Sequence, residues 1–327
     1  MQHQQLAGSR CPVCLSTSTA PALRKDGVLL LRCADCHLRF CAEEPEAAPL
    51  EALYDETYFT GGGAGGAGYD HYLADERTHR RQARRYLHRL EHLGLRPGRL
   101  LDVGCAAGFF LDEARRAGWD AHGIDVSPWA AAHAREHFGL DVRCESLLAA
   151  SPAAPFDVVT VFNVFEHLPT PHAAADRLAR LVRPGGHLLI ETWDADSVFA
   201  RLCGRRWHQY SPHYVPYYYT RASLARLFRP GLWHTVEYGP WTKWISVQRA
   251  CAVVAHDVPT APLRRLVGAV GHSPLGALEL PYSLGDLVLL TLRRRTDRPS
   301  RRSLAPGVPA YGTRERRPLT AATPARP

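Results

Sequence analysis

A regular alternation of strand-like and helix-like segments between residues 99 and 193 restricts the fold more than any other feature. Strands are predicted at 99–105, 121–127, 141–146, 158–163 and 187–193. Helices are predicted between them at 106–118, at 127–139 and around Ala174–Leu181. Strands that alternate with helices favour a parallel sheet that is covered on both faces. The sequence therefore predicts an α/β fold with its ligand site at the carboxyl ends of the strands.

The first strand runs into a turn of small residues, Asp102–Gly108, whose backbone N–H groups can approach a ligand closely. Asp125 ends the second strand, where a carboxylate typically binds the two ribose hydroxyls of a nucleoside. A dinucleotide-binding turn needs glycine at its first, third and sixth positions. Here these are Gly104, Ala106 and Phe109, so the pattern fails. A phosphate loop ending in Gly-Lys-Ser/Thr is absent as well.

Four segments in order resemble the class I S-adenosylmethionine-dependent methyltransferases: LLDVGCAAGFFL, GIDVSP, FDVVTVFNVFEHL and LVRPGGHLLIETW. The resemblance extends to bacterial members with an N-terminal CxxC…CxxC module and a YDETYF-like stretch. It implies a Rossmann-like, doubly wound, mostly parallel seven-stranded sheet, with the last two strands at 236–241 and 286–293. Ala106 departs from the family's middle glycine, and we expect it to be tolerated with a negative φ.

The resemblance also implies roles for individual residues. Asp102 and the turn from Gly104 through Ala106 to Gly108 would hold the methionine end of S-adenosyl-L-methionine. Asp125 would bind the ribose hydroxyls. Glu145 and Ser146 would flank the adenine, and Phe162 and Asn163 would face the sulfonium and the amino-acid portion.

Methyl transfer from a sulfonium is an in-line displacement, so the protein mainly aligns the acceptor and supplies a base. His167 follows the fourth strand, and His213 lies in an aromatic-rich insert after the fifth; both are candidate bases. His167 can instead have a packing or orienting role, and the insert can be a hydrophobic plug rather than a substrate roof. Glu166 could bind a divalent cation, but no clustered carboxylates support this.

Two CxxC pairs stand near the N-terminus, at Cys11, Cys14, Cys33 and Cys36. The 18 residues between the pairs suit a four-thiolate zinc site, with two knuckles completing a tetrahedron. Segments 28–33 and 38–40 could pair as strands. The sequence thus predicts a zinc ribbon or knuckle in which Zn²⁺ is structural, because four thiolates leave no open position. Scattered free cysteines are the alternative.

The chain divides into a zinc module at 1–42, a connecting region at 43–98, a methyltransferase domain at 99–293 and a basic tail at 294–327. The connecting region holds a glycine-rich stretch, Gly61–Gly68, flanked by aromatic residues. This stretch is either a linker or a lid over a bound ligand. A helix is predicted at 73–94. The insert at about 194–285 includes a helix at 220–228 and a helical excursion at 245–285.

The formal net charge of +8 comes entirely from residues 293–327, which hold ten Arg against one Asp and one Glu. We expect this proline-rich tail to be disordered and the body to be neutral. A neutral body argues against nucleic acid and favours a small-molecule acceptor such as a secondary metabolite, a quinone-like compound or a sugar. An RNA base methyltransferase and a non-catalytic zinc-stapled binding protein are the alternatives. The absence of long apolar runs and of a signal core predicts a cytoplasmic protein.

Overall fold

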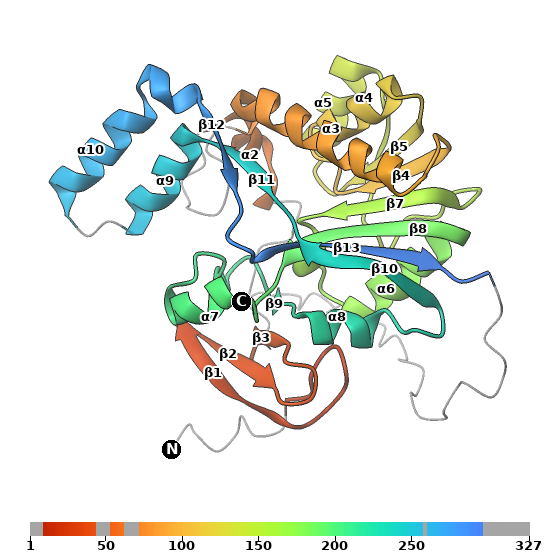
Figure 1. Cartoon of the computed structure of the whole chain (residues 1–327), viewed down its shortest axis with the longest axis horizontal. Coiled ribbons are helices and arrows are strands. Elements are labelled where there is room, and N and C mark those ends of the chain that lie inside the picture. The colour runs from red at the N-terminus through yellow and green to blue at the C-terminus, as the bar shows by residue number, and fades with distance from the viewer. Residues whose placement is uncertain (1–8, 44–52, 62–71, 258–259, 297–327) are drawn as a thin grey trace, which may run out of the picture. The chain divides into compact units, whose positions relative to one another are not determined.

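The computed structural model describes residues 9–43, 53–61, 72–257 and 260–296 (Figure 1). A seven-stranded sheet forms its centre, in the order β10-β13-β8-β7-β4-β5-β6. The strands are β4 (Arg99–Val103), β5 (Asp120–Asp125), β6 (Asp141–Cys144), β7 (Phe156–Phe162), β8 (Val182–Trp193), β10 (Trp233–Pro240) and β13 (Leu287–Arg294). The strands β4 to β8 are parallel, and β13 runs antiparallel to both neighbours, β8 and β10. The predicted doubly wound, mostly parallel sheet is confirmed.

Helices cover both faces of this sheet (Figure 1). One layer contains α3 (Glu76–His92), α4 (Phe109–Arg116) and α5 (Pro128–Phe138), and the other contains α6 (Pro171–Leu181) and α8 (Arg221–Leu227). Adjacent strand residues point to opposite layers: Leu100 packs with Leu90 of α3, whereas Leu101 belongs to the cluster that holds Leu178 of α6. Burial on both faces explains the continuous apolar runs of these strands.

The helix boundaries follow local signals. The hydroxyl of Ser127 accepts a hydrogen bond from the Ala130 amide, and Pro128 occupies the first turn of α5, as predicted. The predicted strand at 187–193 begins earlier, because Val182 already pairs with Phe156 of β7. Within the described residues, every helix is too short or too polar to cross a bilayer.

The N-terminal cysteine module forms a second, antiparallel sheet of β1 (Thr19–Lys25), β2 (Val28–Cys33), β3 (Arg39–Cys41) and β9 (Tyr217–Tyr218). Asp26 and Gly27 form the two-residue turn between β1 and β2, both with positive φ, as a tight hairpin turn requires. The predicted pairing of 28–33 with 38–40 is confirmed. The sequence did not indicate that β9, from the aromatic insert, would pair with β3.

The predicted helical excursion after β10 contains two helices, α9 (Val247–Asp257) and α10 (Ala261–Gly271). They pack together, and a two-stranded ribbon of β11 (Lys243–Ser246) and β12 (Glu279–Tyr282) connects them to the body. The ribbon was not predicted. The expected basic tail lies outside the described residues from 297 onward.

Candidate active site

A cavity of about 750 Å³ opens at the carboxyl ends of the parallel strands. Its walls come from the turn after β4, the ends of β5, β7 and β8, and the aromatic insert. Further wall residues come from α3, from the segment around α2 (Glu56–Thr60), and from the turn between β1 and β2. The strand ends thus converge on one space, as the parallel sheet predicts.

The glycine-rich turn after β4 lines the cavity with the residues from Asp102 to Ala106. The amides of Gly104 and Cys105 both donate to the Ile124 carbonyl, at 2.8 and 3.2 Å. Gly104 has a φ of +74°, and a Cβ there would overlap Val164. Gly108, with a φ of +89°, begins α4 and lies behind the turn rather than in the cavity lining. Glycine is therefore required at both positions.

Ala106 corrects one prediction. Its φ is +48°, in the left-handed region, whereas we expected a negative value. Its amide donates to Oδ2 of Asp125 at 2.8 Å, which fixes the turn against the end of β5. The turn keeps the backbone shape that suits glycine although the residue carries a Cβ.

Asp125 is almost fully buried at the end of β5, and its side chain lines the cavity. Oδ1 accepts from the Ser127 amide at 2.8 Å, and Oδ2 accepts from Ala106. Burial raises the pKa of this carboxyl, although the backbone amides of Ser127, Ala106 and Val126 oppose the shift. Each oxygen has a second acceptor site, so the carboxylate can take two further hydrogen bonds.

Asp102 lines the cavity from the end of β4. Its Oδ1 accepts from the Thr160 hydroxyl at 2.6 Å, and burial raises its pKa to about 7. Glu145 also lines the cavity, and its amide donates to the Asp125 carbonyl. Ser146 does not line it; its hydroxyl accepts from the Ala149 amide in the next turn.

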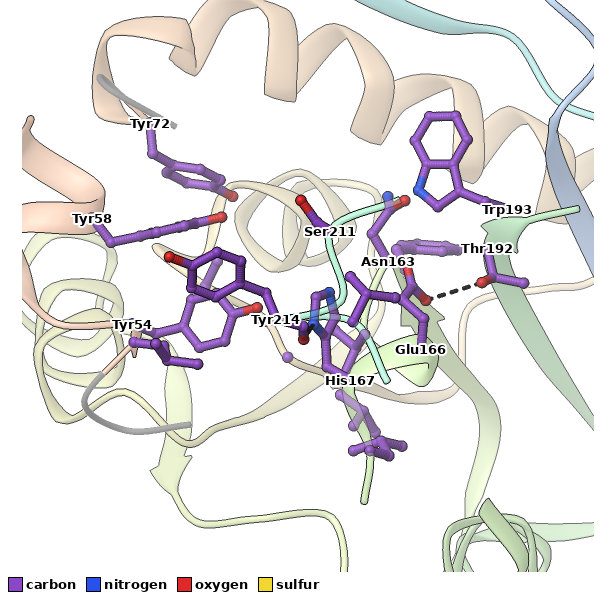
Figure 2. Close-up of a pocket in the computed structure, with 18 of the residues that line it drawn as sticks. Tyr54, Tyr58, Tyr72, Asn163, Glu166, His167, Thr192, Trp193, Ser211 and Tyr214 are labelled. Carbon is purple, nitrogen blue, oxygen red and sulfur yellow. Dashed lines mark hydrogen bonds between the residues drawn. The ribbon is translucent and has the colours of Figure 1, made fainter. Parts of the chain in front are cut away.

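Phe162 and Asn163 lie at the end of β7, facing α3. Phe162 stacks on Tyr86 with the ring centroids 3.8 Å apart. Asn163 has a φ of +53°, and its Nδ2 donates to Glu191 Oε1 at 2.5 Å. Its Oδ1 is buried without a hydrogen-bond partner, and the residue lines the cavity (Figure 2). An unpaired buried acceptor is costly, so this site favours a ligand that donates to it.

The two candidate histidines have different surroundings. Nδ1 of His167 lies 2.9 Å from the Tyr214 carbonyl, and the ring is half-buried in the cavity wall (Figure 2). His213 is exposed, and its Nε2 lies 3.1 Å from the Asp26 carbonyl in the β1–β2 turn. The neighbouring Glu166 is buried, and its Oε2 accepts from Thr192 at 3.0 Å. Within the described chain, only the N-terminal cysteines form a group of three or more potential metal ligands.

Aromatic residues from the connecting region cover part of the cavity. Tyr54, Tyr58 and Tyr72 point into it (Figure 2). Phe59 of α2 stacks on Trp129 of α5 with centroids 5.1 Å apart, which attaches this region beside the end of β5. Most of the glycine-rich stretch predicted as a linker or a lid lies outside the described residues.

A family model described as a methyltransferase domain matches residues 69–230. A ubiquinone biosynthesis O-methyltransferase of Alkalilimnicola ehrlichii is 39% identical over 107 residues, which cover 30% of this chain and 43% of that protein. One of Xylella fastidiosa is 31% identical over 175 residues, which cover 46% of this chain and 69% of that relative. This chain belongs to the class I S-adenosylmethionine-dependent methyltransferases.

The chain spans 43% to 59% of the length of the first curated relatives that it matches. The solved structure of the N-methyltransferase NodS from Bradyrhizobium japonicum with S-adenosyl-L-homocysteine covers 68% of this methyltransferase at 19% identity, with a TM-score of 0.43. The cysteine module and the excursion both lie outside the region that the family model matches.

The four cysteines of the module come together in the methyltransferase as the CxxC spacing predicts. Their sulfur atoms all lie within 4.8 Å of one another, with Cys11 and Cys36 3.5 Å apart and Cys14 and Cys33 3.4 Å apart. Three of the four are buried. The hydrogen bond between Cys11 and Cys36 lowers the pKa of the Cys11 thiol and raises the pKa of the Cys36 thiol.

Sequence reasoning missed several wall residues of the methyltransferase cavity. Tyr86 of α3 donates to Glu191, a fully buried carboxylate at the end of β8. Lys243 and Arg249 reach the cavity from the excursion, and burial together with these two cations lowers the pKa of His79 to about 3. Two features of the sequence could have indicated this pair: Tyr86 lies on the apolar face of its helix, and Glu191 interrupts an apolar strand.

Proposed function

We propose that this methyltransferase transfers a methyl group to a hydroxyl or a carbon of a small molecule. One observation carries the proposal: a single cavity connects the Asp125 turn with the aromatic insert. An in-line displacement needs the methyl donor and the acceptor side by side in a space closed to water. The names of the relatives, ubiquinone biosynthesis O-methyltransferases, support a hydroxyl acceptor.

The residues at the strand ends fit S-adenosyl-L-methionine. Asp125 has acceptor sites left for the ribose hydroxyls, and Glu145 lies beside it for the adenine. The unpaired Oδ1 of Asn163 can accept from the amino group of the methionine portion, which Asp102 and Gly104 would also hold. When bound, the cofactor supplies an electrophilic methyl group on a sulfonium.

Hydrogen bonding supports His167 as the base. A carbonyl oxygen only accepts, so Nδ1 of His167 carries the proton that it donates to Tyr214. Nε2 is then unprotonated and can take the proton of an acceptor hydroxyl as the methyl group is transferred. The same reasoning places the proton of His213 on Nε2, toward Asp26. Each ring thus keeps one unprotonated nitrogen, but His167 is half-buried after β7 whereas His213 is exposed against the β1–β2 turn, so we assign the base to His167 and a positioning role to His213.

The cysteine cluster fits structural Zn²⁺. A tetrahedron with zinc–sulfur bonds of about 2.3 Å places its sulfurs about 3.8 Å apart, close to the observed distances. We infer that Cys11, Cys14, Cys33 and Cys36 hold zinc and that the module supports the aromatic insert through β9. None of the nine cysteines forms a disulfide, which fits the cytoplasmic location that we infer.

Calorimetry with S-adenosyl-L-homocysteine tests the cofactor site. We expect binding to the wild type and a loss of at least tenfold in Asp125→Ala, because the turn loses its anchor and the ribose its acceptor. Asp120→Ala, on the exposed start of the same strand, is the matched control. No binding to the wild type, or equal binding to both variants, would contradict the proposal.

A transfer assay tests the base and the acceptor class. Catechols, hydroquinones, nucleotide sugars and a short RNA are offered with methyl-labelled cofactor. We expect labelling of a small molecule, and a loss of at least a hundredfold in kcat for His167→Gln with a smaller effect of His213→Gln. Labelling of RNA alone would favour the RNA alternative.

A further inference from the structure

The cysteine module provides one wall of the cavity. Lys25 and Asp26, at the turn between β1 and β2, both line it, although they stand 77 and 76 positions before Asp102, the first residue of the strand-end turn. The turn is held in place from the other side, because Nε2 of His213 lies 3.1 Å from the Asp26 carbonyl. A module outside the family's matched region thus reaches into the reaction space.

Basic side chains gather where this turn meets the insert. Lys25 ends β1, and Arg206 ends the short helix η3 (Gly204–Arg206), which lies beside β1. Both side chains line the cavity, together with His213. The end of β1 also lies next to α7 (Val198–Cys203), the helix that precedes η3 (Figure 1).

The Asp26 carboxylate forms only a weak ion pair with Lys25. Lys25 Nζ lies 3.9 Å from Asp26 Oδ1, and the two side chains are 31% and 56% exposed. A solvent-exposed ion pair at this distance contributes little. The three donors of the ammonium therefore stay available for a stronger acceptor.

The charge of the cavity differs between its two ends. The strand ends contribute Asp102, Asp125, Glu145 and Glu166, which suit a cofactor with a sulfonium and an ammonium group. The hairpin end contributes Lys25 and Arg206 with Asp26 as the carboxylate beside them, next to aromatic rings such as Tyr210 and Tyr218, whose centroids are 4.9 Å apart. Lys243 and Arg249 also line the cavity, but both act on His79 of α3, and Lys243 acts on Glu166 and Glu191 at the strand ends.

We propose that Lys25 and Arg206 bind an anionic group of the methyl acceptor, a carboxylate or a phosphate. The β1–β2 turn of the cysteine module is then a specificity-determining part of the enzyme. This inference rests on the proposed function, since it assigns the hairpin end of the cavity to the acceptor.

Calorimetry on the full chain with S-adenosyl-L-homocysteine bound tests the inference with two pairs of probes. Catechol is compared with 3,4-dihydroxybenzoate, and thymidine with thymidine monophosphate, so that each pair differs by one anionic group. We expect one anionic probe to bind at least tenfold more tightly than its neutral partner, since hydrogen bonds to a charged group contribute about 1.5–3 kcal/mol. The pair that responds distinguishes a carboxylate from a phosphate.

Three variants locate the effect. Lys25→Met and Arg206→Met should each reduce the preference for the anionic probe about tenfold. Arg10→Met, an exposed residue of the same module, removes the same charge and should leave the preference unchanged. No preference in the wild type, or a preference lost in Lys243→Met but kept in Lys25→Met, overturns the inference. Failure of S-adenosyl-L-homocysteine to bind would instead overturn the proposed function.

Discussion

The backbone amide of Ala106 donates to Oδ2 of Asp125 across 2.8 Å, which joins the turn after β4 to the end of β5. Ala106 reaches this position only with a φ of +48°. The left-handed backbone of Ala106 is therefore what allows its amide to reach Asp125. The position of the turn at the proposed cofactor site depends on this hydrogen bond.

Ala106→Gly should stabilise the protein by about 1 kcal/mol, because glycine removes the cost of a Cβ in the left-handed region. Chemical denaturation measures the free energy of unfolding. The adjacent buried Ala107, which has no positive φ, provides the control: Ala107→Gly should destabilise by a similar amount. A less stable Ala106→Gly variant would show that the left-handed turn is not strained.

Gly104→Ala should cost about 2 kcal/mol more than Gly118→Ala. Both glycines have positive φ, at +74° and +90°, so backbone strain is common to the two variants. At position 104 the new Cβ would overlap Val164, whereas at position 118 the nearest atoms belong to Pro97, 3.8 Å away. Thermal unfolding and S-adenosyl-L-homocysteine affinity are measured together. Equal losses in both variants would argue against a close-packed turn.

Asp102→Asn should raise the Tm of the cofactor-free protein by several degrees at pH 8 and by much less at pH 4. Burial raises the pKa of Asp102 to about 7, so the folded state binds a proton more tightly than the unfolded state. Stability from this group is therefore present below its ordinary pKa and is lost as the pH rises through 7. Asparagine keeps the acceptor for Thr160 and carries no charge. A pH-independent difference in Tm would contradict the assignment.

Cys36→Ser should reduce zinc content from one ion per chain to well below half and lower the Tm, because a buried ligand of the cluster is lost. Elemental analysis and thermal unfolding measure the two effects. Cys144→Ser, an exposed thiol outside the cluster, should change neither. Retained zinc in Cys36→Ser would exclude the four-thiolate site.

Local patterns predicted the parts of the fold that short stretches of sequence determine. The strand β4, the Ser127 cap of α5 and the meeting of the four cysteines follow from periodicity, capping and ligand spacing. The φ of Ala106 was predicted with the wrong sign, because a hydrogen bond to Asp125 on the next strand decides it.

Contacts between distant segments escaped prediction. The pairing of β9 with β3, the hydrogen bond from Tyr86 to Glu191 and the position of Lys25 in the cavity depend on tertiary packing. No local pattern encodes them, since each joins residues that only the folded chain brings together. The hairpin end of the cavity, where we propose that the methyl acceptor binds, was therefore the part of the site that the sequence predicted least.

The cysteine module completes its sheet with residues that are synthesised much later. The Thr220 hydroxyl donates to the Cys36 carbonyl, 184 positions away, next to the strand β9. At synthesis rates of about 5–20 residues per second, roughly 10–40 s separate these two residues on the ribosome. The nascent module must hold its four thiols through that interval without its last strand. Early metal capture would protect the cysteines from oxidation before the rest of the enzyme exists.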